Sequence, residues 1–187
     1  SIIGAASSLA DPHIPLSDTG RAALAETIRD EGERLDRYIQ NLLDMTRLGY
    51  GALKLKRVPS DLREIVGGAR HRLRGALRGH EVAVEVPDGA APVLVDPLLI
   101  EQVLMNLLDN AAKYAPEASR ITVSARTLGP VMELGVADQG PGIPEGARAR
   151  VFDMFFRVNE GDIQRAGTGL GLAIARGIVE AHGGTIR

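Results

Sequence analysis

The stretch Asp138-Gln-Gly-Pro-Gly-Ile-Pro144 decides the fold, together with Gly167-Thr-Gly-Leu-Gly-Leu172 further along the chain. An asparagine-bearing segment, 98–114, precedes both. The carboxylate of Asp138 can accept a hydrogen bond from an adenine amino group. Glycine backbone can approach phosphates closely, where a side chain would clash, and asparagine carbonyl oxygens can ligate Mg²⁺. The three stretches together predict a site for ATP.

The glycine-rich turn at 167–171 could also belong to one of two other phosphate-binding motifs, the dinucleotide fingerprint or the P-loop. It does not follow a predicted strand, and no acidic ribose-binding residue can follow about 20 residues later, so a dinucleotide fingerprint is disfavoured. The sequence contains no GxxxxGK[ST] segment, which excludes a P-loop. What remains is a glycine turn that leads into a helix predicted at 170–182, where free N–H groups and the helix dipole favour phosphate.

Two asparagines, Asn106 and Asn110, lie four residues apart in the segment 98–114, so both project from one face of a helix. Lys113 and Tyr114 extend the same side by one turn. A solvated polar stripe is the alternative, but leucines flank the pair, and asparagine is a poor helix former that needs a reason to be there. We interpret this face as part of the nucleotide site.

Residues 1–50 are predicted to form a helical hairpin. Two prolines within 11–15 end a first helix, and Ser17 or Asp18 caps a long second one. The second helix carries apolar residues at spacings of three and four, with two more that widen the stripe: Leu24, Ile28, Leu35, Tyr38, Leu42, Met45, and then Ile39 and Leu43. Such a stripe favours a four-helix bundle, and therefore a homodimer, over an isolated hairpin.

After a hinge at Gly49 and Gly51, residues 51–187 mix both periodicities. Helices are predicted at 61–78, 98–114 and 170–182, and strands at 80–86, 93–95, 120–126, 131–137 and from 185 onward. Helices and strands segregated in this way predict an α+β fold, a two-layer sandwich with a mixed, mostly antiparallel sheet under helices, preceded by the hairpin.

Composition limits the classes of partner. A net charge of −2 gives no reason to expect nucleic acid. The absence of cysteine excludes disulfides and thiolate metal sites and fits a reducing cytoplasm. No apolar run approaches the roughly 18–20 residues of a spanning helix, so we expect any membrane contact to be made by regions outside this sequence.

Four segments, in order, resemble the motif boxes of the sensor histidine kinases: 101–114 the N box, 138–142 the G1 box, 151–157 the F box and 167–171 the G2 box. Residues 1–9 and 41–48 resemble the KdpD-like members of that family. The resemblance implies the GHKL, or Bergerat, ATP-binding fold over 51–187, lacking its closing strand. Residues 1–50 would be the partial dimerisation hairpin, without its acceptor histidine.

The resemblance also implies roles for single residues. Asn110 would ligate Mg²⁺, while Asn106 and Lys113 would face the phosphates and take part in the transfer with Arg157, which would steady the γ-phosphate. Asp138 would accept from the adenine amino group, although an ordinary Asx turn is its alternative. The full set of implied nucleotide contacts is Asn106, Asn110, Lys113, Tyr114, Asp138, Gly140, Gly142, Ile143, Arg165, Gly167, Thr168, Gly169, Leu170 and Gly171. Residues 157–165 are interpreted as a lid.

The family transfers the γ-phosphoryl of Mg-ATP to a histidine and then to an aspartate of a response regulator. The four histidines are His13, His71, His80 and His182, and none lies in an acidic-Leu-Arg-Thr-Pro context like that of the acceptor. The acceptor is expected shortly before Ser1. We therefore expect ATP binding without autophosphorylation, in the cytoplasmic portion of a membrane-anchored bacterial protein.

Two alternatives remain. An ATPase of the wider gyrase and MutL superfamily would need a general-base glutamate one turn before the metal-binding asparagine. Asn106 occupies that position, and Glu101 lies five residues before it. The other alternative is a dimerisation module with a vestigial nucleotide site, which the presence of Asn110, Asp138 and Gly169 disfavours.

Overall fold

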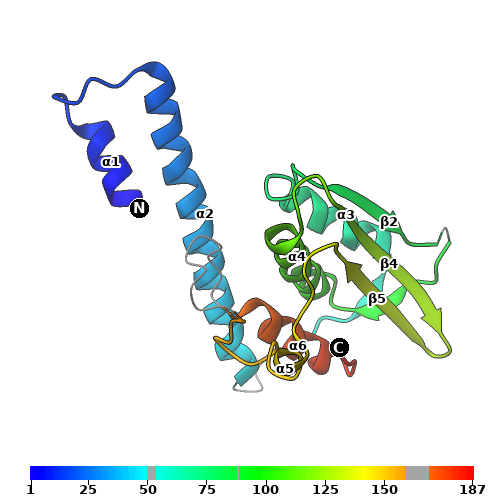
Figure 1. The fold of residues 1–187 in the computed structure, drawn as a ribbon. Helices are drawn as coiled ribbons and strands as arrows, with labels where there is room; N and C mark the ends of the chain where they lie inside the picture. Colours follow the sequence, from blue (N-terminus) through cyan, green and yellow to red (C-terminus); the bar gives the residue numbers. More distant parts are fainter. Residues whose placement is uncertain (50–53, 88, 159–168) are drawn as a thin grey trace. The chain divides into compact units, whose positions relative to one another are not determined.

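Contacts divide the chain into two units, Ser1–Thr46 and Arg47–Arg187. The structure is a computed structural model that describes residues 1–49, 54–87, 89–158 and 169–187 (Figure 1). The predicted boundary between 50 and 51 therefore falls outside the described residues.

The first unit contains helix α1 (Ile2–Ala10) and most of helix α2 (Asp18–Gly49). The side chain of Ser17 accepts from the N–H of Gly20 at 3.1 Å, which caps the start of α2. On α2, Leu35 is 52% exposed and Ile39 is 49% exposed. The predicted helix, proline-bearing break and long second helix are all present, and part of the predicted apolar stripe is open to solvent. The side chains of Tyr38, Leu42 and Met45 lie outside the described part of α2.

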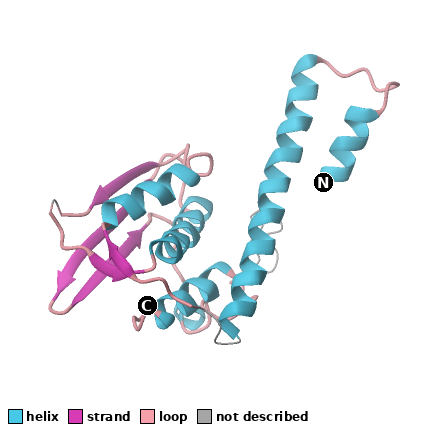
Figure 2. Cartoon of the chain, turned by 180° about the vertical axis from the view of Figure 1, so that it is seen from behind, coloured by secondary structure: helices cyan, strands magenta, loops and turns pink. Residues whose placement is uncertain are grey.

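The second unit contains both strands and helices. In chain order these are β1 (Val58–Ser60), α3 (Leu62–Arg72), β2 (Glu81–Glu85), β3 (Val93–Val95), α4 (Pro97–Tyr114), β4 (Arg120–Leu128), β5 (Val131–Ala137), α5 (Glu145–Arg148) and α6 (Gly171–Ala181). Strand β4 pairs in parallel with β2 and antiparallel with β5, while β1 and β3 form a separate antiparallel pair. Within this unit the strands gather on one side and the helices on the other (Figure 2). The α+β fold and its mixed sheet are confirmed.

The core lies between α4, α3 and the three-stranded sheet. Strand β4 alternates, so Ile121 and Val123 point inward and are fully buried. They join Leu104 and Leu108 of α4 and Val66 of α3 in one apolar cluster. Burial of each such side chain stabilises the fold by about 1.5–3 kcal/mol. This cluster fixes α4, the helix that carries the two asparagines, against the sheet.

Two predicted elements differ from the structure. The helix predicted over 61–78 ends at Arg72 and continues as turns, because Gly75 follows within one turn and glycine disfavours helix. Leu77, beyond the helix end, is still buried. The strand predicted from 185 onward is not formed, and Arg187 instead pairs with Glu133 of β5 at 2.7 Å. Strand β1 is not predicted, because its three residues are too few to show an alternation.

Glu133 should make the fold sensitive to acid. The hydrogen bond from Arg126 Nε, at 2.6 Å across the β4–β5 ladder, lowers the pKa of Glu133 below its usual 4.5. Desolvation of the carboxylate acts in the opposite direction and raises this pKa, whereas the positive charges of Arg126 and Arg187 lower it further. A carboxyl with a lowered folded-state pKa stabilises the fold above its unfolded pKa and loses that contribution as the pH falls through the folded value. We expect Glu133→Gln to be less stable than the wild type near neutral pH, with the difference closing below about pH 4. Urea unfolding of both proteins between neutral pH and below about pH 4 measures the difference in their free energies of unfolding. A difference that stays constant with pH would contradict the prediction.

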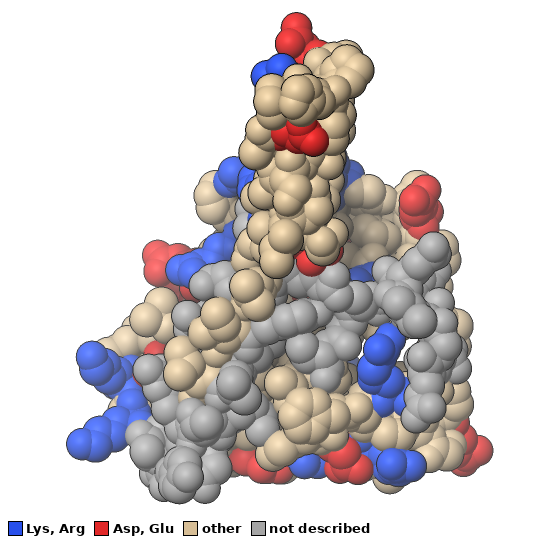
Figure 3. All heavy atoms as spheres, turned by 90° about the vertical axis from the view of Figure 1, so that its left-hand side faces the viewer, with Lys and Arg blue, Asp and Glu red and all other residues tan. Residues whose placement is uncertain are grey.

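Charged side chains of both signs are interspersed on the face shown in Figure 3. Among the described residues, no helix combines the length and apolarity needed to cross a membrane.

Candidate functional site

Helix α4 is the element around which the predicted site residues are arranged. Asp96 caps it by accepting from the N–H of Leu99 at 3.4 Å, and Pro97 occupies its first turn, where a missing N–H costs nothing. The helix ends at Tyr114, with Ala115 in extended conformation just before Pro116. These start and stop signals are local, which is why the sequence predicts the helix closely.

Asn106 carries a buried amide nitrogen that has no hydrogen-bond partner among the described residues. A buried, unsatisfied polar group costs about 1–3 kcal/mol, so a site is expected to satisfy it when occupied. Gly171, the first residue of α6, packs directly against this side chain: a Cβ built there would lie 3.5 Å from Asn106 Oδ1. The turn predicted to bind phosphate therefore delivers the N-terminus of α6 to Asn106.

Lys113 forms an ion pair with Asp109, one helical turn back. Their side chains are 30% and 21% exposed, respectively. Lys113 is predicted from the sequence to face the phosphates, and no role is predicted for Asp109. The i,i+4 spacing of opposite charges could have revealed the pair. Lys113 must exchange this carboxylate for another anion before it can reach a phosphate.

The turn after β5 abuts the end of α4. Asp138 Oδ1 accepts from the N–H of Gly140 at 2.7 Å, which is the Asx turn of the alternative reading, and it orients the carboxylate. A Cβ on Gly140 would lie 3.1 Å from the carbonyl oxygen of Tyr114 and 2.7 Å from Asp138 Oδ1, so only glycine fits there. Both Tyr114 and Ile143 have side chains more than two-fifths exposed. Asp138 is itself exposed and open to a ligand.

The F box meets the glycine turn through backbone contacts. The N–H of Phe155 donates to the carbonyl of Gly169 at 3.0 Å. Gly169 has φ +69°, and a Cβ built on it would lie 2.7 Å from the carbonyl carbon of Phe155. The Arg150 guanidinium lies 4.5 Å from the ring centroid of Phe156, a contact that the sequence analysis missed. Arg157 is half-buried.

Three of the predicted contacts, Arg165, Gly167 and Thr168, lie outside the described residues, as does most of the predicted lid. The others occupy α4, the Asp138 turn and the start of α6. The chemistry of this set suits a nucleotide with a hard cation: an amide oxygen at Asn110, donors at Asn106 and Lys113, and an exposed acceptor at Asp138. In the part of the chain that the structure describes, no group of three or more His, Cys, Asp or Glu forms an all-protein metal site.

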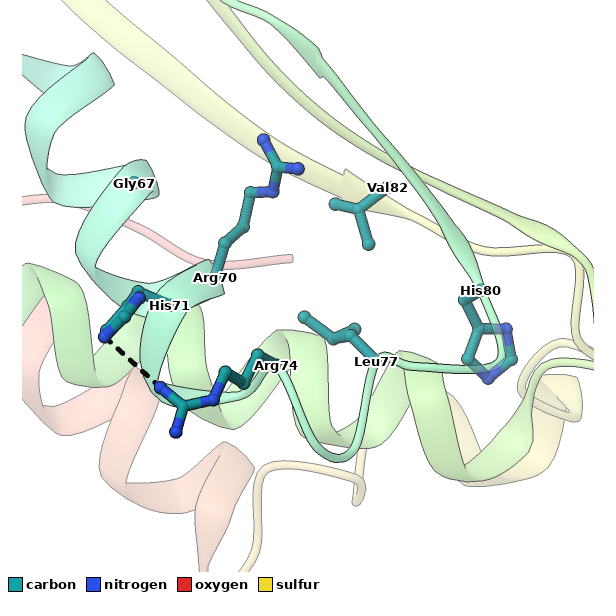
Figure 4. A pocket seen from close by; sticks show the side chains of 7 residues that line it. All are labelled: Gly67, Arg70, His71, Arg74, Leu77, His80 and Val82. Carbon is teal, nitrogen blue, oxygen red and sulfur yellow. Dashed lines mark hydrogen bonds between the residues drawn. The ribbon is translucent and has the colours of Figure 1, made fainter.

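A separate cleft of about 370 Å³ lies between α3, the turns that follow it and β2 (Figure 4). Its lining residues are Gly67, Arg70, His71, Arg74, Leu77, His80 and Val82. Arg74 donates to Nε2 of His71 at 3.4 Å, and the side chains of Arg70 and Arg74 leave in different directions. The cleft shares no residue with the predicted nucleotide contacts.

Comparisons with known proteins point to one family. A family model described as histidine kinase-, DNA gyrase B-, and HSP90-like ATPase matches residues 95–187. The sensor protein KdpD of Escherichia coli (strain K12) is 41% identical over 165 residues, which cover 88% of this chain and 18% of that protein. KdpD of Clostridium acetobutylicum is 38% identical over 187 residues, covering 99% of this chain and 21% of that protein. The chain belongs to the sensor histidine kinase family.

A similar solved structure supports the fold. The crystal structure of full-length ShkA in complex with AMPPNP matches with a TM-score of 0.73 at 27% identity, covering 96% of this chain and 37% of ShkA. The chain spans about a fifth of the length of the KdpD relatives. The matched ATPase segment, 95–187, contains every residue of the implied nucleotide set.

Within this histidine kinase fold, Glu101 faces away from the asparagine pair. It lies five residues before Asn106, a rotation of roughly 140° about the helix axis. Its carboxylate meets Arg72 of α3 at 2.9 Å and packs against Gly68, where an added Cβ would lie 2.8 Å from it. Asn106 instead faces α6 through Gly171. Glu101 is therefore turned toward α3, where it forms its ion pair with Arg72.

Proposed function

We propose that the chain binds Mg-ATP among α4, the Asp138 turn and the Gly169 turn. We further propose that it is the catalytic ATP-binding region of a protein-histidine kinase, which passes the γ-phosphoryl to a histidine and onward to an aspartate of a response regulator. The observation that carries the proposal is the contact of two glycine motifs with one helix: Gly140 against Tyr114, and Gly171 against Asn106 with its unsatisfied amide. The AMPPNP of the similar ShkA structure supports the same ligand class.

The residues fit phosphoryl transfer, in which the protein contributes mainly positioning and charge neutralisation. Asp138 would orient the base, and the backbone at the start of α6 would hold phosphate oxygens. Asn106, Lys113 and Arg157 would steady the charge that shifts toward the bridging oxygen. Mg²⁺, held by Asn110, would neutralise phosphate charge. This arrangement provides no covalent nucleophile of its own.

Hydrolysis of ATP by water is the rival reaction, and the placement of Glu101 disfavours it. A general base must come within hydrogen-bond reach of the water that it activates. Glu101 is held by Arg72 on the α3 side, and Asn106 stands where the ATPase class would place its glutamate.

Incubation with γ-labelled ATP should therefore neither label the chain nor release phosphate above the background of a heat-denatured sample. Three of the four histidine side chains already have hydrogen-bond partners: His71 with Arg74, His80 with Ala112 and His182 with Ile178. A stoichiometric, acid-labile label on the chain would contradict the expectation that none of its four histidines is the phosphoryl acceptor. Sustained phosphate release that is lost in Glu101→Gln would support the ATPase instead.

We also propose that α2 mediates a homodimer in the intact protein. Leu35 and Ile39 are about half exposed and four residues apart, so they form a continuous apolar face. Paired helices would remove that face from water. We expect the wild type to associate in sedimentation equilibrium and Leu35→Glu to be monomeric. An unchanged mass for the variant would contradict this.

The proposed setting is the cytoplasmic portion of a membrane-anchored bacterial protein, where ATP and a response regulator are both available. The KdpD relatives, named as sensor proteins, support it. Fractionation of the full-length protein tests this setting, and full recovery in the membrane-free fraction would contradict it.

A further inference from the structure

A partly buried junction joins the ends of α4 and α6 that lie away from the predicted phosphate site. The backbone N–H of Asp96, which precedes α4, donates to Nε2 of His182, which follows α6, at 3.0 Å. Nδ1 of the same imidazole donates to the carbonyl of Ile178 at 2.8 Å. Because a backbone N–H can only donate, Nε2 accepts, and the ring is neutral with its proton on Nδ1. Both nitrogens of His182 are therefore used.

The junction also fastens the segment that precedes β1. The carboxylate of Asp96, in a residue only 8% exposed, accepts from the N–H of Lys56 at 2.9 Å as well as from Leu99. The Arg57 guanidinium donates to the carbonyl of Ala181 at 3.1 Å. Three segments distant in sequence thus meet at one point, with Asp96 and His182 at its centre.

The lengths of the two helices connect this junction to the nucleotide site. His182 lies eleven residues after Gly171, about 16 Å along α6, and Asn106 lies ten residues after Asp96, about 15 Å along α4. Contacts at both ends, His182 with Asp96 and Gly171 with Asn106, show that the helices run antiparallel over matching lengths. Sliding α6 by one residue would move Gly171 by about 1.5 Å relative to Asn106.

We propose that His182 is a positioning residue for nucleotide binding: its neutral imidazole sets the register of α6 against α4 and so places the phosphate-binding turn at Asn106. This rests on the proposed function. The buried residues of α6 are Ala173, Ile174, Ala175 and Ile178, all apolar. Apolar burial is not directional, whereas a hydrogen bond is, so the bond between Asp96 and His182 can select one register of the packed helices. The role differs from that of the acceptor histidine, because both ring nitrogens are engaged in hydrogen bonds within the fold.

Calorimetric titration of Mg-ATP into four proteins tests the proposal: the wild type, His182→Leu, His182→Gln and Val86→Ala. Leucine fills similar space without an acceptor, whereas the glutamine carbonyl can reach the Asp96 N–H. Val86 is buried in the core and outside the junction, so its truncation controls for general destabilisation. Melting temperatures of the unliganded proteins are measured alongside.

We expect His182→Leu to raise the Kd for Mg-ATP at least fivefold, while His182→Gln and Val86→Ala stay within twofold of the wild type. Equal Kd values for the wild type and His182→Leu, or equal weakening in His182→Leu and His182→Gln, would overturn the proposal for His182 but leave the proposed function standing. A wild type that binds no Mg-ATP would overturn the proposed function as well. If His182→Leu does not fold, the ¹⁵N spectrum of the wild-type imidazole decides: a proton on Nδ1 is expected, and a proton on Nε2 overturns the proposal.

Discussion

Replacing Gly169 with alanine should lower the melting temperature of the chain by roughly 5–15 °C, the equivalent of about 2–4 kcal/mol. Two effects add. The backbone at φ +69° is strained for any residue with a Cβ, at about 1–2 kcal/mol. The new Cβ would also lie 2.7 Å from the carbonyl carbon and 2.8 Å from the Cα of Phe155, backbone atoms that cannot swing aside. The F box must then separate from the glycine turn, and binding of Mg-ATP should fall with it.

Gly183→Ala is the matched control for this collision. Gly183 also has a left-handed backbone, at φ +83°, but nothing lies within 4 Å of an added Cβ. It should show only the conformational part of the loss, about 1–2 kcal/mol. Thermal unfolding followed by circular dichroism measures both. Equal losses in the two variants would show that the contact between Phe155 and Gly169 contributes nothing.

Replacing Asp138 with asparagine should weaken Mg-ATP binding by about 10- to 150-fold, since a hydrogen bond to a charged group contributes about 1.5–3 kcal/mol. The asparagine carbonyl can keep the bond from the Gly140 N–H, so the turn and the melting temperature should be preserved. Its amino group, however, would meet the adenine amino group donor to donor. Calorimetry on both proteins measures the change.

Mg-ITP supplies the control for the Asp138 prediction, because inosine has an oxygen where adenine has the amino group. The wild type should prefer ATP to ITP, and Asp138→Asn should lose or reverse that preference. If asparagine weakens both nucleotides equally, Asp138 acts on the shape of the turn and does not read the base.

Local signals account for what the sequence predicts well. Asp96 and Pro97 open α4, and Ala115 with Pro116 closes it, so this helix can be assigned without knowledge of the fold. The alternation of Ile121 and Val123 likewise places β4 with one face in the core. Elements without such signals were missed or misplaced. Strand β1 has three residues, and its pairing with β3 depends on a segment more than thirty residues away.

The site shows the same division between local and distant information. The motif order predicts which residues contact the nucleotide, and the spacing of Asn106 and Asn110 places these two asparagines on one face of α4. Neither the motif order nor the spacing could reveal that Gly171 lies against Asn106, or that the N–H of Asp96 reaches His182 across 86 positions. Those contacts arise from the packing of α6 along α4. The pairing of Lys113 with Asp109 was readable from the sequence, but it became apparent only in the structure.

Titration of Mg-ATP into the wild-type chain by isothermal calorimetry tests the central claim most directly. We expect saturable binding of one nucleotide per chain. This binding should be lost when Mg²⁺ is chelated, and it should be strongly weakened in Asp138→Asn. The melting temperature should rise at saturation, because the ligand binds only the folded state. The absence of heat with Mg-ATP, Mg-ADP and AMPPNP alike, together with an unchanged melting temperature at millimolar nucleotide, would contradict the account.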